Sequence, residues 1–319
     1  MIDEPGIYDM DEATYNADPC ADISLRSSIA SKLVDRGSTP RHAWFACPRL
    51  NPDFKPDNRR MFDLGKACHA SLLGKGSKLL IIKDDSYRSK MAKELRDAAY
   101  AVGEIPLLEY EAAQVFEMAD AARQQLGDLV AAGTLSQMPF AAGETEKTLV
   151  WRDRGVTCRA RLDGLPSDGE TLFDYKTTAA SADPALWQFR QFRVLGYDFQ
   201  LAFYRRGLEA LGIAHSPTFG CIVQEVFEPY LLSFVRVDDE VIARADERVV
   251  QALNIWAKCL RTGQWPGYSL AGYDIELTER ERQQEIATAP KSDHLYSENM
   301  PDTAYSGITF DRRKDAPAP

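Results

Sequence analysis

The stretch that decides the fold is residues 158–178, which read CRARLDGLPSDGETLFDYKTT. Its first half alternates, so that Arg159, Arg161 and Asp163 share one face of an extended strand while the residues between them are apolar. Residues 166–169 are the turn formers Pro, Ser, Asp and Gly, after which the chain returns as TLFDYKTT. We therefore predict a β-hairpin.

The returning strand places Asp174 and Lys176 on one face, about 6 to 7 Å apart at the usual rise per residue. Hard divalent cations prefer carboxylate and carbonyl oxygens, so Asp163, Asp174 and the Tyr175 carbonyl are candidate ligands. Lys176 can orient the attacking water or stabilise charge on a phosphate. The pattern favours metal-assisted phosphodiester hydrolysis. The alternative is an exposed hairpin with solvated charges, because Asp-x-Lys is a common tripeptide.

Four short motifs in one order carry a family resemblance. FDLGKACHASLLG comes first, followed by RARLDG, DYKTT and YDFQLAFY. This order resembles the PD-(D/E)xK nuclease superfamily, in the branch of RecE (exonuclease VIII), phage lambda exonuclease and the RecB nuclease domain. In that resemblance Asp163 takes the place of the motif aspartate, Asp174 that of the (D/E), and Lys176 that of the lysine.

The flanking motifs add further residues. The Gly-x-x-x-His helix of the family implies that His69 is an extra metal ligand; the alternative is a core histidine beside an apolar stripe. The Gln-x-x-x-Tyr helix implies that Gln200 and Tyr204 bind nucleic acid or support the site. Arg161 is assigned to the same supporting group. Glu146 matches an acid that precedes the motif strands, with a role in metal tuning or phosphate positioning; an exposed edge carboxylate is the alternative.

The resemblance implies an α/β fold with a restriction-endonuclease-like core, in which helices flank a central mixed sheet and helical additions precede it. The implied activity is Mg2+-dependent, with Mn2+ as a substitute. It would digest one strand of linear double-stranded DNA from the 5′ end and leave a 3′ single strand for an annealing protein. Relatives form rings around DNA, which implies a homo-oligomer.

Composition sets the class and the compartment. Of 319 residues, 45% are hydrophobic and 27% charged, as expected of a soluble chain. No apolar run approaches membrane-spanning length, and the first residues are acidic, so we expect a cytoplasmic protein without a membrane. The cysteines lack C-x-x-C spacing, which predicts no iron-sulfur cluster, and no G-x-x-x-x-G-K-[ST] is present, which predicts no use of ATP.

Charge is unevenly distributed along the chain. The net charge is −10, yet residues 147–206 hold ten bases and seven acids, a local balance of +3. We expect DNA phosphates to lie against this segment. Arg205 and Arg206 contribute to that balance, although they can equally serve only to solvate a helix end.

Periodicity divides the chain into an N-terminal extension (1–60), a nuclease core (61–270) and a polar, loosely ordered tail (271–319). Within it we expect helices over 25–34, 61–73, two in 88–132, one ending at 211 and one from about 238 to 262, with strands after 143, over 218–226 and over 229–237.

Two other function classes remain open. A catalytically silent nucleic-acid or protein-binding module could use the same fold, but it would have little reason to keep Asp163, Asp174, Lys176 and His69 together. An endonuclease, either a restriction enzyme or a junction resolvase, shares the bare hairpin motif. The Gly-x-x-x-His and Gln-x-x-x-Tyr helices favour the exonuclease.

Overall fold

The structure, a computed structural model, describes residues 1–55, 63–140, 145–165, 171–213, 218–271 and 275–288. The chain divides into two units, Met1–Tyr268 and Ser269–Pro319. In the second unit the structure contains α10 (Glu279–Thr288), where the sequence indicated no regular element. Thr278 and Glu281 cap this helix reciprocally, since each backbone N–H donates to the side chain of the other residue (2.8 and 3.3 Å).

The first unit contains an antiparallel sheet of order β1–β4–β5, formed by Gly6–Asp9, Thr145–Asp153 and Val156–Gly164. The turn between β4 and β5 is Arg154-Gly155, and both residues have positive φ (49° and 76°). Such a turn matches the twist of a two-residue hairpin. It therefore fixes the register of the two strands that carry the acids of the site.

A second, mixed sheet has the order β6–β7–β8, formed by Thr171–Thr178, Thr218–Glu225 and Leu232–Val237. β6 and β7 are parallel, while β7 and β8 are antiparallel. The parallel pair needs a crossover, which α7 (Pro184–Trp187) and α8 (Tyr197–Ala210) provide. Asp183 begins this crossover, because its side chain accepts a hydrogen bond from the Leu186 N–H (3.0 Å).

The predicted β-hairpin over 158–178 is wrong. β5 pairs with β4, and β6 pairs with β7 in a separate sheet. Leu25 takes the edge of β5 away from β4 only at Thr157 and Arg159 (2.8 Å each), and nearer the turn the Tyr175 N–H of β6 donates to the Asp163 side chain (2.7 Å) and not to the backbone of β5. The turn itself, at 166–170, lies outside the described residues.

A third, two-stranded parallel sheet joins β2 (Leu79–Ile82) and β3 (Ile105–Leu108). The sequence indicated only a break between two helices at β3, and those helices are present as α5 (Lys90–Ala101) and α6 (Glu109–Ala131). All four residues of β3 are buried. Burial, rather than the alternation typical of an exposed strand, therefore defines it.

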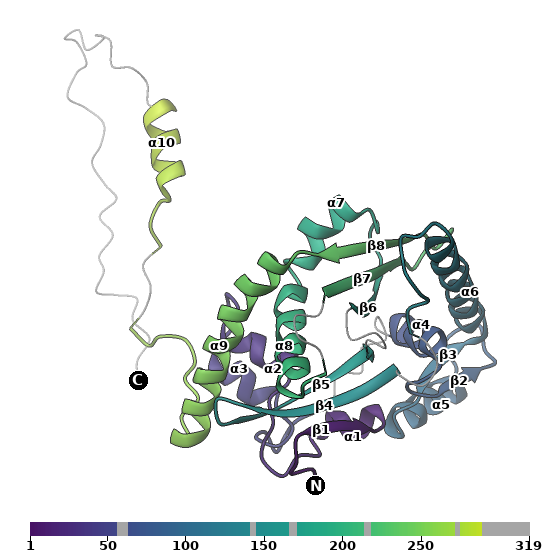
Figure 1. The fold of residues 1–319 in the computed structure, drawn as a ribbon, viewed down its shortest axis with the longest axis horizontal. Coiled ribbons are helices and arrows are strands. Elements are labelled where there is room, and N and C mark those ends of the chain that lie inside the picture. The colour runs from purple at the N-terminus through teal and green to yellow at the C-terminus, as the bar shows by residue number, and fades with distance from the viewer. Residues whose placement is uncertain (56–62, 141–144, 166–170, 214–217, 272–274, 289–319) are drawn as a thin grey trace, which may run out of the picture. The chain divides into compact units, whose positions relative to one another are not determined.

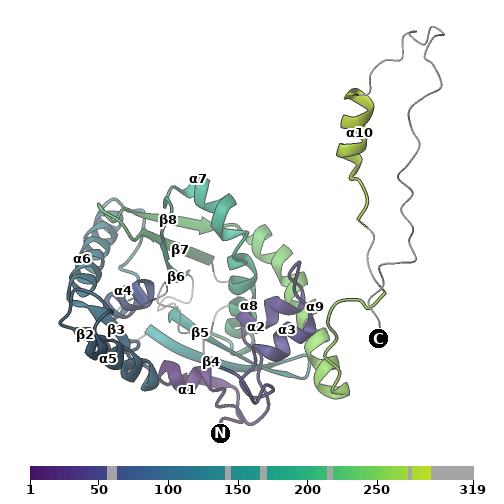
Figure 2. The same ribbon diagram turned by 180° about the vertical axis from the view of Figure 1, so that it is seen from behind.

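Helices cover both three-stranded sheets. Figures 1 and 2 show α4 and α6 at one side of the sheets and α8 and α9 at the other. Trp151 of β4 packs edge-on against Phe203 of α8, with ring centroids 5.1 Å apart. The remaining helices are α1 (Glu12–Asn16), α2 (Ser27–Ala30), α3 (Pro40–Phe45), α4 (Asp63–Leu73) and α9 (Asp239–Thr262), with a 3-10 turn at Ser31–Leu33 and a π-helix at Gln188–Phe192.

The α/β class, with sheets flanked by helices, agrees with the prediction. The six cysteines all belong to described segments and are buried free thiols. Among the described helices, none combines the length and the apolar character needed to cross a bilayer.

Candidate functional site

Two carboxylates face each other across β4 and β5. The ladder pairs Thr145 with Gly164 and Lys147 with Leu162, so the register places Glu146 and Asp163 opposite each other between these two pairs. Like charges in this arrangement repel, and a cation between them offsets the repulsion. Glu146 also has a φ of 56°, a left-handed conformation that is uncommon for a residue other than glycine. Such strain persists where the surrounding structure enforces it, and it is concentrated at functional sites.

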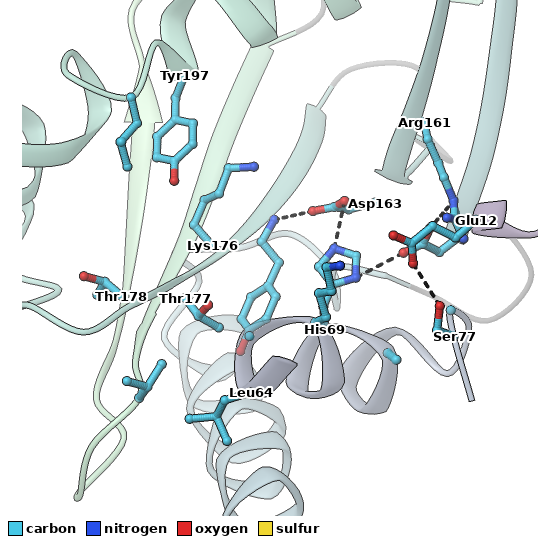
Figure 3. Close-up of a pocket in the computed structure, with 18 of the residues that line it drawn as sticks. Glu12, Leu64, His69, Ser77, Arg161, Asp163, Lys176, Thr177, Thr178 and Tyr197 are labelled. Atoms are coloured by element: carbon cyan, nitrogen blue, oxygen red, sulfur yellow. Dashed lines mark hydrogen bonds and ion pairs between the residues drawn. The ribbon is translucent and has the colours of Figure 1, made fainter. Parts of the chain in front are cut away.

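His69 lies between the two acids. Its Nδ1 is 3.1 Å from Glu146 Oε1 and its Nε2 is 2.9 Å from Asp163 Oδ1. Figure 3 shows His69 on its helix, α4, directed at Asp163. The helix approaches β6 closely because residue 65 is glycine: a Cβ there would be 2.7 Å from Thr177 Oγ1. Gly65 therefore sets the distance between the histidine and the strands.

The electrostatics of the trio favour a positive charge at its centre. Burial lowers the pKa of His69, but attraction to Asp163 and hydrogen bonds to Asp163 and Glu146 outweigh it and raise that pKa to about 10. Burial raises the pKa of Asp163, but the charge of His69 and the hydrogen bond from His69 lower it by more. The pKa of Asp163 is therefore below its usual value. The donor atoms of His69, Glu146 and Asp163 all lie within 4.8 Å of one another. Two carboxylate oxygens and an imidazole nitrogen at this spacing form a donor set for a divalent metal ion.

Lys176 lies beside the trio. Its Nζ is 2.6 Å from Asp174 Oδ2 and 4.8 Å from the centre of the Tyr197 ring. Asp174 is 1% exposed, and burial, opposed by Lys176 but reinforced by Asp163, raises its pKa to about 6. Burial lowers the pKa of Lys176, but Asp174 and Asp163 together raise it above its usual value. Lys176 therefore keeps its charge next to Asp163.

Tyr175 connects the two sheets. Its N–H donates to Asp163 Oδ2 (2.7 Å) from the edge of β6 that faces away from β7. The carbonyl of a strand residue leaves the same edge as its N–H, so the Tyr175 carbonyl also faces the acids. Its hydroxyl contacts Cys68 Sγ (3.1 Å) and donates to Gln224 Oε1 inside the core. The backbone between Asp174 and Lys176 is thus held from both sides.

Of the residues described above, His69, Glu146, Asp163, Tyr175 and Lys176 line one cavity of roughly 720 Å³, whereas the buried Asp174 is not among the lining residues. Arg161 lines it, and its Nε forms an ion pair with Glu146 Oε2. Glu12 and Tyr15 of the N-terminal extension line it as well. Glu12 accepts a hydrogen bond from Ser77 (3.0 Å), as Figure 3 shows. The cavity is therefore bordered by acids, bases and aromatic rings.

Comparison with protein families decides the identity of the fold. Residues 41–273 match the model of a PDDEXK-like domain of unknown function (DUF3799). The chain belongs to this family. Its PDDEXK-like domain contains His69, Glu146, Asp163, Asp174 and Lys176 within the matched residues. The match also confirms the resemblance to the PD-(D/E)xK superfamily.

One solved structure is similar to this chain in fold, and a second matches it with a lower score. A protein from Eubacterium rectale described as a "putative exonuclease" has 11% identity and a TM-score of 0.50, over 84% of this chain and 93% of that chain. A phage related exonuclease from Haemophilus somnus 129PT has 12% identity and a TM-score of 0.27, over 62% of this chain and 95% of that chain. Among curated proteins, none matches the sequence.

Gln200 and Tyr204 of the PDDEXK-like domain lie behind the cavity and are not among the residues that line it. Gln200 Nε2 donates to the Tyr204 hydroxyl (2.6 Å), and Tyr204 is 5% exposed. Burial raises the pKa of Tyr204, and the charges of Asp174 and Asp163 raise it further. Gln200 and Tyr204 therefore bond to each other close to the acids, and neither side chain lines the cavity.

The structure brings together His69, Asp163, Asp174, Tyr175 and Lys176 as the sequence indicated. The sequence did not indicate that Glu146 is a donor equal to Asp163, or that Tyr197 covers Lys176. The position of Glu146 depends on its positive φ and on the register between β4 and β5, and neither can be read from the sequence. Arg205 and Arg206 form ion pairs with acids of the same unit, among them Glu209, Asp153 and Asp246. Those pairs favour their structural role.

Proposed function

We propose that this protein is a Mg2+-dependent DNA exonuclease, for which Mn2+ is a substitute, acting on the ends of linear double-stranded DNA. The observation that supports it best is the donor cluster of His69, Glu146 and Asp163 beside the charged Lys176. Membership of a PDDEXK-like family agrees with a nuclease. We further propose digestion from 5′ to 3′, giving 3′ single strands for an annealing protein, and assembly as a homo-oligomer.

The metal would be held by His69, Glu146 and Asp163, with the Tyr175 carbonyl and Asp174 on the adjoining strand. When bound, it supplies Lewis-acid chemistry for hydrolysis and neutralises phosphate charge. Its carboxylate ligands agree with the preference of Mg2+ for oxygen.

The chain's own residues orient the substrate. Lys176 has a positive charge held by Asp174 and by the face of Tyr197, so it can bind the scissile phosphate and stabilise charge that develops on it. The Tyr175 N–H holds Asp163 in one orientation. Arg161 holds Glu146 in the same way.

The test compares two topologies of one DNA. Linear duplex and covalently closed circular duplex of the same sequence are incubated with the purified protein, with Mg2+ or with chelator. We expect nucleotide release from the linear form only, none with chelator, and earlier loss of a 5′ label than of a 3′ label. Nicking of the closed circles would identify an endonuclease, and inertness on every substrate would favour a silent binding module.

A further inference from the structure

The segment 186–197, here called the rim segment, exposes large apolar side chains next to the cavity. The exposed fractions are 45% for Leu186, 67% for Phe189, 72% for Val194 and 59% for Leu195. Single exposed apolar residues are ordinary on a protein surface, but a group within one short segment marks an interaction site.

The exposure does not result from a loosely attached segment. Trp187 and Phe192 are buried, and Tyr197 stacks on Trp187 with ring centroids 5.7 Å apart and planes at 20°. Gln191 Nε2 donates to Thr178 Oγ1 of β6 (2.7 Å). The segment is therefore anchored at several points while its apolar side chains point to solvent.

The backbone of the rim segment is unusual. Residues Gln188–Phe192 form a π-helix, and Gly196 has a φ of 70° just before α8 begins. π-Helices are rare and occur frequently at functional sites. This geometry places Phe189 on the exposed side while Phe192 enters the core.

The rim segment is also basic. Arg190 and Arg193 are both exposed. Within the part of the chain that the structure describes, neither forms an ion pair, in contrast to Arg205 and Arg206. Exposed aromatic and apolar side chains beside free guanidinium groups match a polyanion that also offers flat apolar faces, which describes nucleic acid with unpaired bases.

The rim segment is continuous with the catalytic cavity. Gln191, Leu195 and Tyr197 line that cavity together with Lys176 and Asp163. Figure 3 shows Tyr197 beside Lys176, on the side away from His69. A DNA strand with its phosphate at Lys176 would therefore meet the rim segment within a short distance along the strand.

We propose that the rim segment binds single-stranded DNA next to the scissile phosphate, with a base stacked on Phe189 and phosphates bound by Arg190 and Arg193. This inference rests on the proposed nuclease function and names the form of DNA that the site accepts. Single strands are favoured over duplex because paired bases hide the faces that an aromatic ring stacks on.

The test measures binding of a fluorescent oligothymidylate about 15 nucleotides long to the full-length protein, in chelator, by anisotropy. We expect Phe189→Ala to raise Kd at least about fivefold, because a base–aromatic stack is lost. Phe189→Trp keeps the stack and should bind within about twofold of the unmodified protein, whereas Phe189→Leu should bind as weakly as the alanine variant. The double variant R190A/R193A should reduce the salt dependence of log K by about 0.7 per arginine.

Matched controls use exposed residues of the same types on other elements, α3 and α9. Phe45→Ala removes a phenylalanine that is 64% exposed on α3, and R244A/R261A removes two exposed arginines of α9. Both should leave Kd and the salt dependence unchanged. Thermal melts of every variant check that it is folded.

The outcomes separate this inference from the proposed function. Equal binding by the unmodified protein and Phe189→Ala, or tighter binding of duplex than of single strand, overturns the rim segment as a single-strand site even if linear DNA is cleaved. Loss of binding in Phe189→Ala with no cleavage of any DNA supports the rim segment and overturns the exonuclease. Self-association that disappears in Phe189→Ala, without DNA binding, shows a protein interface in its place.

Discussion

The two ends of β5 carry charged clusters of different kinds. At one end Arg159 lies 3.1 Å from Asp18, donates to the Ser24 carbonyl (3.0 Å), and, like Asp18, has a side chain that is 0% exposed. At the other end Asp163 and Glu146 face each other and share His69. The first cluster is closed to solvent at Arg159 and Asp18, with Arg49 as a second base 3.9 Å from Asp18; the second lines the cavity, and Arg161 adds a base there by pairing with Glu146.

This difference explains which cluster can act on a substrate. The side chains of Arg159 and Asp18 are closed to solvent, so a substrate cannot reach them. The Asp163 cluster opens into the cavity, and two facing carboxylates favour a further cation. Residues of the same strand face thus serve stability at one end and chemistry at the other.

The largest effect is expected at the open end. Asp163→Asn removes a metal-binding charge without changing the shape of the side chain, so cleavage of linear duplex should fall at least about 10³-fold. Single-turnover rates with saturating Mg2+ measure this. Asp18→Asn, at the closed end, is the matched control, and its folded molecules should cleave normally. A rate for Asp163→Asn within tenfold of the unmodified protein would contradict the assignment.

A substitution at the closed end of β5 should change the stability of the protein. Arg159→Ala removes the nearer base of the buried Asp18 and leaves only Arg49, at 3.9 Å, which costs about 3 kcal/mol in the free energy of unfolding. Urea titration followed by fluorescence measures the loss. A change below about 1 kcal/mol would show that the buried pair is not what attaches the N-terminal residues to β5.

Metal dependence distinguishes His69 from an ordinary core histidine. His69→Ala should raise the Mg2+ concentration for half-maximal activity about 10- to 100-fold. It should also reduce the increase in Tm that Mg2+ gives the unmodified protein, because binding to the folded state stabilises it. His42→Ala on α3, whose ring contacts Thr39 Oγ1 (2.9 Å), is the control and should change neither measurement. Equal Mg2+ dependence of all three proteins would remove His69 from the site.

Two glycines allow the same substitution to alanine at two locations, one beside the candidate site (Gly65) and one in the core (Gly207). Gly65→Ala should push α4 away from Thr177 and raise the Mg2+ requirement about tenfold, since His69 moves with the helix. Gly207→Ala meets Trp151 at 2.9 Å and should lower stability while leaving the Mg2+ requirement unchanged. Titration of activity with Mg2+ and thermal melts on both variants separate the two. An identical pattern for both would mean that the α4 approach does not position His69.

The smallest effect is expected behind the cavity. Tyr204→Phe loses one hydrogen bond from Gln200, about 1 kcal/mol, so the single-turnover rate should fall no more than about fivefold. Lys176→Ala, measured in the same way, should cost more. The reverse order would show that Tyr204 touches the substrate.

Sequence alone could reach the part of the site that depends on local spacing. The period of a strand put Asp174 beside Lys176, and the structure has them ion-paired. His69 required the family resemblance, because a single histidine on a helix gives no distance to strands that lie far along the chain, where its partners Glu146 and Asp163 are.

The rest depends on register and on competition between partners. Nothing in the sequence shows that Glu146 lies opposite Asp163, because the β4–β5 ladder fixes that register. The hairpin prediction failed because strand formers do not reveal which neighbour they choose: β5 pairs with β4, and β6 pairs with β7. The sequence did not indicate the contact between Tyr197 and Lys176. The chain between them contains a π-helix and Gly196, whose irregular backbone cannot be predicted from hydrophobic periodicity.

The N-terminal residues have a consequence for where this domain can be cut. The family match begins at residue 41, yet β1, the backbone partner of β5 at Leu25, and the acid that neutralises Arg159 all precede it. A chain trimmed to the family boundary would expose the outer edge of β4 and leave a guanidinium charge buried without its counter-ion. The segment shared by relatives and the segment able to fold by itself therefore have different beginnings.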